Sequence, residues 1–193
     1  SDGTSVLNAI SARSGLETFY GQSPGTISRG TPYNLGRFTE MLMEGRAVYR
    51  KNSGWKAIRG GKASGELVGG YLLNFALLME GEFFKVNSKK RYLLFLEDHI
   101  CFNQPPAVSR YLSHIGQSGL MDRVDGLIFG HYDEKPQPEI EKILKRFGER
   151  HGIPVVWCDD FGHGENQAIL PIGVEAHLDA DEETLTFLES LVL

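Results

Sequence analysis

The chain has 193 residues and a net charge of −5, which argues against nucleic acid as its main partner, because phosphate binding requires a basic surface. Hydrophobic residues make up 41% of the chain and charged residues 23%, a composition that supports a globular core without disulfides or metals. The sequence has no signal peptide and no apolar run long enough to cross a membrane, so we expect a cytoplasmic protein with no membrane partner.

The N-terminal segment predicts one helix followed by a loop. Residues 2–14 are expected to be helical, with Asp2 as the N-cap and Gly15 ending the helix. The buried face of this helix is expected to carry the apolar residues at helical spacing, namely Val6, Leu7 and Ile10. Residues 18–36 are rich in Gly, Ser, Thr, Pro and Tyr and are predicted to form a loop.

A boundary between two domains is predicted near residues 45–60. Residues 38–44 are short and amphipathic, which indicates one or two helical turns. Short strands are expected at 47–50 and 55–59, around a turn at 51–54.

The second half of the chain alternates between apolar runs and amphipathic helices. Strands are expected at 91–96, 124–130 and 153–158. Helices are expected at 72–79, after a turn at Gly69-Gly70, and at 106–118 and 139–150. The alternation predicts right-handed βαβ units and a parallel sheet, and therefore an α/β fold. Residues 173–178 and 184–188 alternate as a β-hairpin does, with a terminal helix as the alternative.

Polar side chains follow each of the three predicted parallel strands. Because the carboxyl ends of parallel strands meet at one edge of a sheet, where ligands bind, we expect the chemistry of the protein at that edge. The residues that follow the strands are Glu97, Asp98, His99, His131, Tyr132, Asp133 and the segment 159–164.

Two residues at this edge are the favoured candidates. His163 stands between Gly162 and Gly164, which let the backbone turn sharply and clear space around the imidazole. Glu97 ends an apolar run, so its carboxylate is either a solvated loop residue or a functional group held in place. His131 is the second choice of histidine. The remaining histidines are interpreted as surface or packing residues: His99, His114, His151 and His177.

A zinc site is the alternative at the same edge, since several possible ligands converge there: Asp98, His99, His131, Asp159, Asp160 and His163. The chain has no HExxH and no CxxC motif, so we expect solvated acids and no metal or other cofactor. Cys101 and Cys158 lie in or just after apolar runs and are expected to be reduced and buried.

Ser1 is the candidate nucleophile. It directly precedes the helix that Asp2 is expected to cap, so its hydroxyl would lie at a helix N-terminus, where backbone N–H groups bind an oxyanion. The alternative is that Ser1 has no catalytic role.

Short segments along nearly the whole chain match one family in the family's own order. The N-terminal ones are Ser1-Asp2-Gly3-Thr4-Ser5 and residues 15–21. The later ones are residues 65–72, in which Tyr71 replaces the commoner Asn of G-x-L-x-G-G-N-L, then 94–98, 126–130, 153–155, 161–163 and 170–173. Together they resemble the serine peptidases that include LD-carboxypeptidases and microcin C immunity peptidases.

The resemblance implies a serine hydrolase. Ser1 would be the nucleophile, His163 the general base and Glu97 the acid that orients it. The backbone N–H of Asp2 would bind the oxyanion. The substrate would be a small peptide, either a murein tetrapeptide or a microcin-type peptidyl or aminoacyl nucleotide. Two aromatic residues are candidates for lining the substrate pocket, with core packing as the alternative: Trp55 and Tyr71.

The resemblance also implies two domains and a homodimer. Residues 1–45 would be the remnant of an N-terminal α/β domain that carries the nucleophile elbow, with the rest of that domain upstream of Ser1. Residues 46–193 would form a C-terminal swivelling β/α domain that carries Glu97 and His163.

Two other functions remain open. The chain is alternatively a non-catalytic swivelling domain that binds a ligand or partner. An N-terminal nucleophile hydrolase would use the α-amine of Ser1 as the base, but the predicted βαβ order disfavours its β-rich fold.

Overall fold

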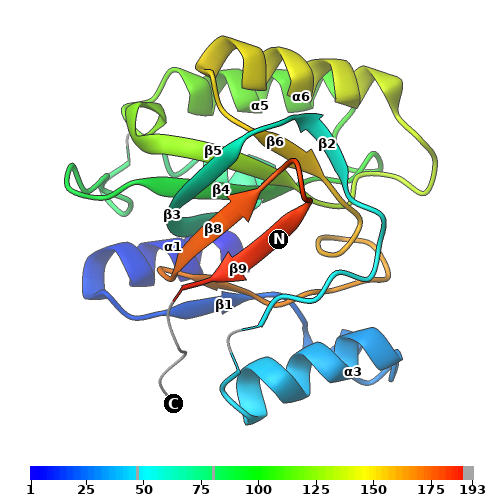
Figure 1. Cartoon of the computed structure of the whole chain (residues 1–193). Coiled ribbons are helices and arrows are strands. Elements are labelled where there is room, and N and C mark those ends of the chain that lie inside the picture. Colours follow the sequence, from blue (N-terminus) through cyan, green and yellow to red (C-terminus); the bar gives the residue numbers. More distant parts are fainter. Residues whose placement is uncertain (47, 80, 189–193) are drawn as a thin grey trace.

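A computed structural model of the chain describes residues 1–46, 48–79 and 81–188 (Figure 1). Its central sheet has seven strands in the order β2-β6-β5-β4-β3-β8-β9. The strands are β2 (Lys56–Arg59), β3 (Lys62–Tyr71), β4 (Tyr92–Glu97), β5 (Val124–Phe129), β6 (Val155–Trp157), β8 (Glu175–Asp179) and β9 (Thr184–Phe187). The pairs β3–β4, β4–β5 and β5–β6 are parallel, and β8 and β9 form an antiparallel hairpin. The predicted α/β class and terminal hairpin are confirmed.

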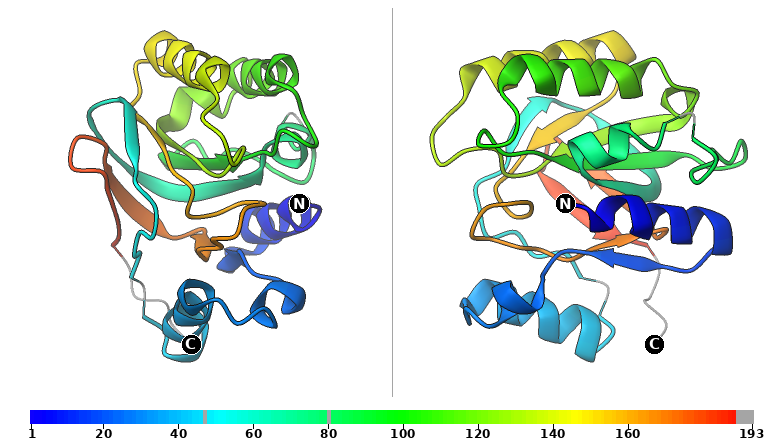
Figure 2. Two further views of the ribbon diagram at one scale, coloured as in Figure 1. Left: turned by 90° about the vertical axis from the view of Figure 1, so that its right-hand side faces the viewer. Right: turned by 180° about the vertical axis from the view of Figure 1, so that it is seen from behind.

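Helices cover both faces of this sheet. Helices α5 (Pro105–Gly116) and α6 (Pro138–His151) lie side by side on one face, and α1 (Gly3–Ser14) lies on the other (Figure 2). A two-stranded sheet of β1 (Thr18–Tyr20) and β7 (Leu170–Ile172) accompanies α1. The remaining helical segments are short: α2 (Pro24–Ile27), α3 (Pro32–Phe38), the π-helical turn Thr39–Met43, α4 (Leu72–Ala76) and the 3₁₀ turn Met121–Arg123.

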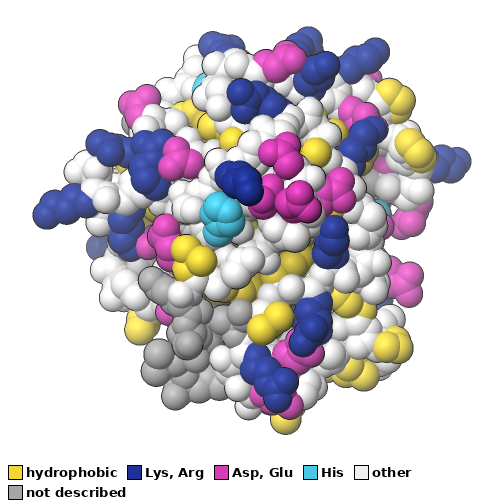
Figure 3. Space-filling view, viewed as in Figure 1, with side chains coloured by type: hydrophobic (Ala, Val, Ile, Leu, Met, Phe, Trp, Pro, Cys, Tyr) yellow, Lys and Arg dark blue, Asp and Glu magenta, His cyan; other side chains and the backbone are white. Residues whose placement is uncertain are grey.

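Acidic and basic side chains are interspersed over the face of the molecule that carries β8 and β9 (Figure 3).

The strands and helices predicted between residues 91 and 158 are confirmed, with small differences at their ends. All of β4 is buried because helices lie on both faces of the sheet. The apolar stripe of α6 is also buried: Ile140, Ile143, Leu144 and Phe147. The helix predicted at 72–79 is confirmed as α4, which ends earlier, at Ala76.

The structure differs from the prediction in the N-terminal part. Residues 18–36, predicted as a loop, contain β1, α2 and the start of α3. Residues 48–50 form no strand, and Ala47, in the same predicted strand, lies outside the described residues. The strand predicted at 55–59 is confirmed as β2. Strand β1 pairs with β7, far along the chain, so its own three residues do not specify it.

Helix α1 is confirmed, and Gly15 ends it in the left-handed conformation with φ +72°. The predicted apolar face is wrong for Val6 and Ile10, which are 58% and 42% exposed, whereas Leu7 is partly buried and packs against the core. The buried residues of α1 are instead small and polar: Thr4, Asn8 and Ser11. Helix α1 therefore binds the sheet through hydrogen bonds and close backbone approach.

The polar face of α1 docks on a glycine-rich part of β3. The Asn8 amide donates to the Gly69 carbonyl (2.7 Å) and accepts from the Gly69 N–H (3.2 Å), while the Thr4 hydroxyl accepts from the Tyr71 N–H (2.9 Å). The turn predicted at Gly69-Gly70 is wrong, since both residues lie inside β3 with φ of +148° and +129°. A Cβ at Gly70 would lie 2.6 Å from the Thr4 hydroxyl oxygen. Glycine is needed there for the helix to approach.

A buried carboxylate connects the segment before β2 to the end of β6. Asp160 is 0% exposed and accepts hydrogen bonds from the backbone N–H groups of Asn52 (3.0 Å) and Ser53 (2.7 Å). It also accepts from the Tyr49 hydroxyl (3.1 Å) and from Nε1 of Trp55 (2.8 Å). A carboxylate removed from water needs such donors, so these bonds fix the connecting segment on the sheet.

Both cysteines are free thiols. Cys158 is buried as predicted, whereas Cys101 is exposed in the turn after β4, so that prediction is wrong. Among the helices of the described residues, none combines the length and apolar character needed to span a membrane.

Replacing Asp160 tests its role as a structural centre. Asp160→Ala is expected to lower the free energy of unfolding by about 3 kcal/mol, because buried donors lose their shared acceptor. Urea denaturation followed by circular dichroism measures the change. Asp122→Ala, at an exposed position, is the control and should change stability by less than about 0.5 kcal/mol. Equal stability of the two variants would contradict the assignment.

Candidate active site

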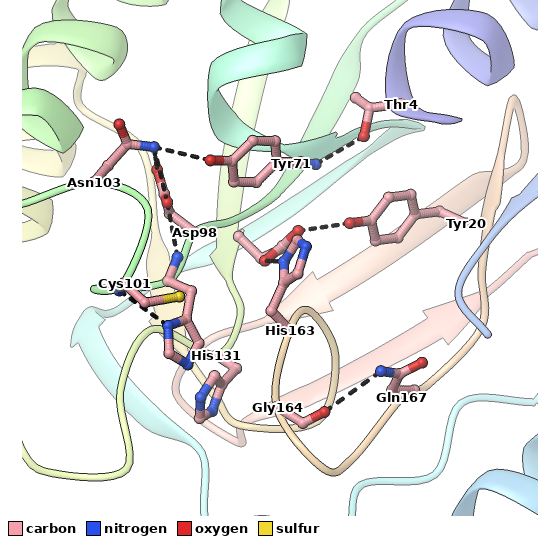
Figure 4. A network of polar contacts seen from close by, with 12 residues as sticks. Thr4, Tyr20, Tyr71, Asp98, Cys101, Asn103, His131, His163, Gly164 and Gln167 are labelled. Atoms are coloured by element: carbon pink, nitrogen blue, oxygen red, sulfur yellow. Dashed lines mark hydrogen bonds and ion pairs between the residues drawn. The ribbon is translucent and has the colours of Figure 1, made fainter. Parts of the chain in front are cut away.

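The carboxyl ends of the parallel strands assemble the candidate site. Tyr71 ends β3, Glu97 ends β4, His131 follows β5, and the loop 159–164 follows β6. Figure 4 shows Tyr71, His131 and His163 in one region, among side chains joined by polar contacts. The sheet topology brings these residues together from separate parts of the chain, at the edge where parallel sheets bind ligands.

Glu97 is the centre of this network. Its side chain is 0% exposed, Oε1 accepts a 2.6 Å hydrogen bond from the Tyr20 hydroxyl, and Oε2 lies 2.8 Å from Nδ1 of His163. An ionised carboxylate only accepts hydrogen bonds, so Nδ1 of His163 is the donor, and the neutral imidazole in this orientation carries its lone pair on Nε2. This tautomer is the one that a general base needs.

Tyr20 belongs to the site although no sequence pattern predicts it. It lies at the end of β1, where it pairs with Leu170 of β7, and is only 8% exposed. Burial, and then the adjacent Glu97 carboxylate, raise the pKa of Tyr20 well above its usual value. The phenol therefore stays protonated and donates to Glu97 at neutral pH.

Aromatic rings enclose one side of His163, whose side chain is 25% exposed. The ring centroids of Tyr71 and Phe102 lie 5.3 Å and 4.9 Å from that of the imidazole, in edge-on geometry. Tyr71 is buried, and its hydroxyl accepts a 2.9 Å bond from the Asn103 amide. Phe102 is 56% exposed and forms an apolar wall beside the imidazole. Tyr71, a predicted pocket residue, thus contacts His163 from a buried position.

The two glycines that flank His163 have separate structural reasons. Gly162 has φ +111°, and a Cβ there would lie 2.9 Å from Oε2 of Glu97. A Cβ at Gly164 would lie 2.7 Å from Cγ of His131. The turn therefore packs against a different side chain at each end, and a larger residue at either position would displace it.

Ser1 lies at the amino end of α1 and is exposed. It lines a cavity of about 370 Å³ together with Tyr20, Gly162 and His163, so the predicted nucleophile and base face the same space. Within the part of the chain that the structure describes, no hydrogen bond joins Ser1 to His163. Asp2, the predicted oxyanion donor, follows at the N-cap position of α1 with helical backbone angles.

A second buried carboxylate lies beside Glu97. Asp98 is 0% exposed and accepts from the Asn103 amide (3.1 Å to each oxygen) and from the His99 N–H (2.7 Å). Burial raises the pKa of Asp98 to about 7 in spite of these bonds. The Tyr132 hydroxyl donates to the Asn103 carbonyl (2.8 Å) and holds that residue in place.

Trp55, the other predicted pocket residue, is 6% exposed and donates to Asp160, so its position fits the packing alternative.

His131 is 2% exposed and is bonded through Nδ1 to Asp159. The His99 ring lies 5.2 Å from that of His131, so His99 is also part of this region. Over residues 1–46, 48–79 and 81–188, no group of three His, Cys, Asp or Glu side chains is placed to hold a metal ion.

Comparisons of the sequence point to one family. The family model described as LD-carboxypeptidase C-terminal domain matches residues 64–178. A curated relative from Synechocystis sp. is 30% identical over 195 residues, which cover 97% of this chain and 62% of that protein. The Bacillus subtilis protein named "Probable murein peptide carboxypeptidase" is 26% identical over 196 residues, which cover 95% of this chain and 60% of that protein. The chain thus spans just over 60% of the length of the first of these relatives.

Solved structures share the fold. A muramoyltetrapeptide carboxypeptidase from Oxalobacter formigenes is 25% identical, with a TM-score of 0.76 over 97% of this chain and 66% of that chain. An MccF-like protein from Bacillus anthracis str. Ames is 22% identical, with a TM-score of 0.79 over 97% of this chain and 65% of that chain. The second likeness is evidence of fold alone.

Asp98→Asn tests the buried carboxyl beside Glu97. A carboxyl whose pKa rises on folding binds its proton more tightly in the folded chain, so the folded state loses stability as pH rises from the usual carboxyl pKa towards 7. The free energy of unfolding of both proteins is compared at about pH 5 and about pH 8. The wild type should lose roughly 2 to 3 kcal/mol more over this interval than Asp98→Asn, which has no carboxyl at this position. Urea denaturation at both pH values measures the difference. An equal fall in the two proteins would refute the assignment.

Proposed function

Because this chain belongs to the LD-carboxypeptidase family, we propose that it acts as a serine hydrolase on an amide bond of a small peptide, with Ser1, His163 and Glu97 as catalytic residues. One observation carries the proposal. The buried Glu97 carboxylate lies 2.8 Å from Nδ1 of His163, at a cavity that Ser1 also lines. This arrangement pairs a base with the acid that orients it, and a candidate nucleophile lines the same cavity as the base.

His163 is the general base of the proposed reaction. Its Nε2 takes the proton of the Ser1 hydroxyl as the oxygen attacks the carbonyl carbon of the amide, and the Glu97 carboxylate stabilises the imidazolium that forms. The imidazolium then gives this proton to the leaving amine, and the C–N bond breaks to leave an acyl-serine. A water molecule, deprotonated by Nε2 in the same way, attacks the ester and releases the acid and free Ser1.

Tyr20 supports Glu97 in this mechanism. A fully buried carboxylate is costly unless both oxygens have donors. The Tyr20 hydroxyl satisfies Oε1, which leaves Oε2 to His163 and fixes the plane of the carboxylate. Tyr20 is thus a positioning residue in the proposed mechanism.

We infer that the oxyanion binds at the amino end of α1. The first N–H groups of a helix have no intrahelical acceptor, and the helix dipole favours negative charge there. The backbone N–H of Asp2 directly follows the proposed nucleophile, and the Thr4 N–H closes the first turn onto the Ser1 carbonyl (3.0 Å).

The names of relatives support two substrate classes. The Oxalobacter formigenes structure is named a muramoyltetrapeptide carboxypeptidase, and an MccF-like protein from Streptococcus pneumoniae is solved in complex with AMP. MccF itself is solved with glutamyl sulfamoyl guanosine and with aspartyl sulfamoyl adenosine. For this chain we propose a murein tetrapeptide or a peptidyl or aminoacyl nucleotide, with Tyr71 and Phe102 on the apolar side of the pocket.

The proposal extends to domains and assembly. Residues 1–45 would belong with the nucleophile domain and residues 46–193 would form the C-terminal domain, in a cytoplasmic homodimer. The match of the C-terminal-domain family model to residues 64–178 supports this division.

Single substitutions test the catalytic residues in the protein as its gene encodes it. Ser1→Ala, Glu97→Gln and His163→Gln should each lower kcat by about 10²- to 10⁴-fold, because each removes one part of the proton-transfer chain. Mass spectrometry of a murein tetrapeptide, and of an aminoacyl nucleotide, follows release of the product. His114→Ala, an exposed histidine on α5, is the matched control and should retain full activity.

Full activity in any of the three variants would remove that residue from the mechanism. If the wild type hydrolyses neither substrate but binds one of them in calorimetry, the function is that of a non-catalytic binding domain.

A further inference from the structure

His131 lies against the turn that carries His163 but takes no part in the proposed proton transfer. Its side chain is 2% exposed. The ring packs directly on Gly164, where an added Cβ would lie 2.7 Å from both Cγ and Nδ1 of His131. The opposite end of the turn, Gly162, packs on Glu97 in the same close way. The turn that carries His163 therefore lies between two side chains, one that ends β4 and one that follows β5.

Two further contacts fix His131 to the loop that contains the turn, and a third hydrogen bond closes that loop. Its backbone N–H donates to the Phe161 carbonyl (2.9 Å), and its Nδ1 is hydrogen-bonded to the Asp159 carboxylate. The Asn166 amide donates to the Asp159 carbonyl (3.0 Å) and closes the loop. Within the described residues, Nε2 of His131 has no hydrogen-bond partner, so the Asp159 contact sets the orientation of the ring.

The charges around His131 strengthen this contact. Burial opposes the charging of the imidazole, but the hydrogen bond and charge of Asp159 outweigh it and raise the pKa of His131. Glu134, with an oxygen 3.9 Å from Nε2, and Glu97 act in the same direction. Burial, and then the charges of His131 and His163, lower the pKa of His99 beside it. These charges favour the protonated imidazole, whose hydrogen bond to a carboxylate is stronger than that of the neutral ring.

We propose that His131, oriented by Asp159, is a positioning residue that fixes the Gly162–His163–Gly164 turn at the end away from Glu97. Glu97 orients the imidazole of His163 through Nδ1, and His131 sets the backbone from which that imidazole extends. The inference rests on the proposed role of His163 as the general base. Small displacements of a catalytic group cost much of its effect, so the loss of this support should slow the reaction.

A double-mutant cycle tests the contact between His131 and Gly164. His131→Ala removes the ring, and Gly164→Ala places a methyl group where the ring lies. Each single variant should lower kcat by about 10- to 100-fold with little change in KM, because the base is misplaced while the rest of the cavity is kept. The double variant should be no slower than the slower single variant, since the methyl group then occupies the space that the ring has left.

A second measurement follows the position of His163 without any substrate. The Nδ1 proton of His163, bonded to Glu97, gives an NMR signal that is assigned by its loss in His163→Gln. This signal should shift or broaden in Gly164→Ala and in His131→Ala. Asp159→Ala should shift the signal as well. Because the Asp159 side chain is 54% exposed, this variant leaves the core intact and replaces His131→Ala if that variant fails to fold. Gly36→Ala, a glycine with open space around it, and His114→Ala are the controls and should leave the signal unchanged.

The two measurements separate failure of this inference from failure of the proposed function. If the wild type hydrolyses nothing, the NMR signal alone decides whether His131 positions His163. Folded variants of His131, Asp159 and Gly164 with the wild-type signal would overturn the inference. Independent losses that multiply in the double variant would overturn it too.

Discussion

The candidate site depends on one buried carboxylate. Glu97 is 0% exposed, and its two donors come from opposite ends of the chain, Tyr20 in β1 and His163 in the loop after β6. Since a carboxylate without donors is destabilising in a protein interior, β1 and this loop must both close on β4. The interaction that orients the proposed base is therefore also one that holds the two ends of the fold together. Stability and function are coupled at Glu97.

The position of Ser1 depends on a second close contact, between α1 and β3. Asn8 takes both backbone groups of Gly69 as hydrogen-bond partners, and Thr4 takes the N–H of Tyr71. These bonds leave α1 little freedom to rotate or slide, because a polar contact of fixed geometry is more selective than an apolar one. Tyr71 is also the residue that packs on His163. The docking of α1 thus couples the helix that begins beside Ser1 to the ring beside the base.

Sequence patterns predict the regular core and two of the site residues, but they miss the contacts that define the site. Strand β4 follows from a continuous apolar run, and Glu97 is noticed because it ends that run. Strand β3 is missed because Gly65, Gly69 and Gly70 interrupt its apolar pattern for the sake of close packing. The polar face of α1 and the role of Tyr20 have no periodic signal. Each is explained only by a partner that is distant in sequence.

The glycines around His163 show when a local pattern does report a distant contact. Gly162 and Gly164 are visible in the sequence, and each is required by one distant side chain: Glu97, which ends β4, and His131, which follows β5. A side chain that packs closely on a backbone requires glycine at that position, and the glycine can be seen in the sequence. A contact between two side chains, such as that of Tyr20 with Glu97, requires no glycine and gives no such signal. The Gly-His-Gly pattern therefore identifies the turn and implies two neighbours, but their identity follows only from the order of strands in the sheet.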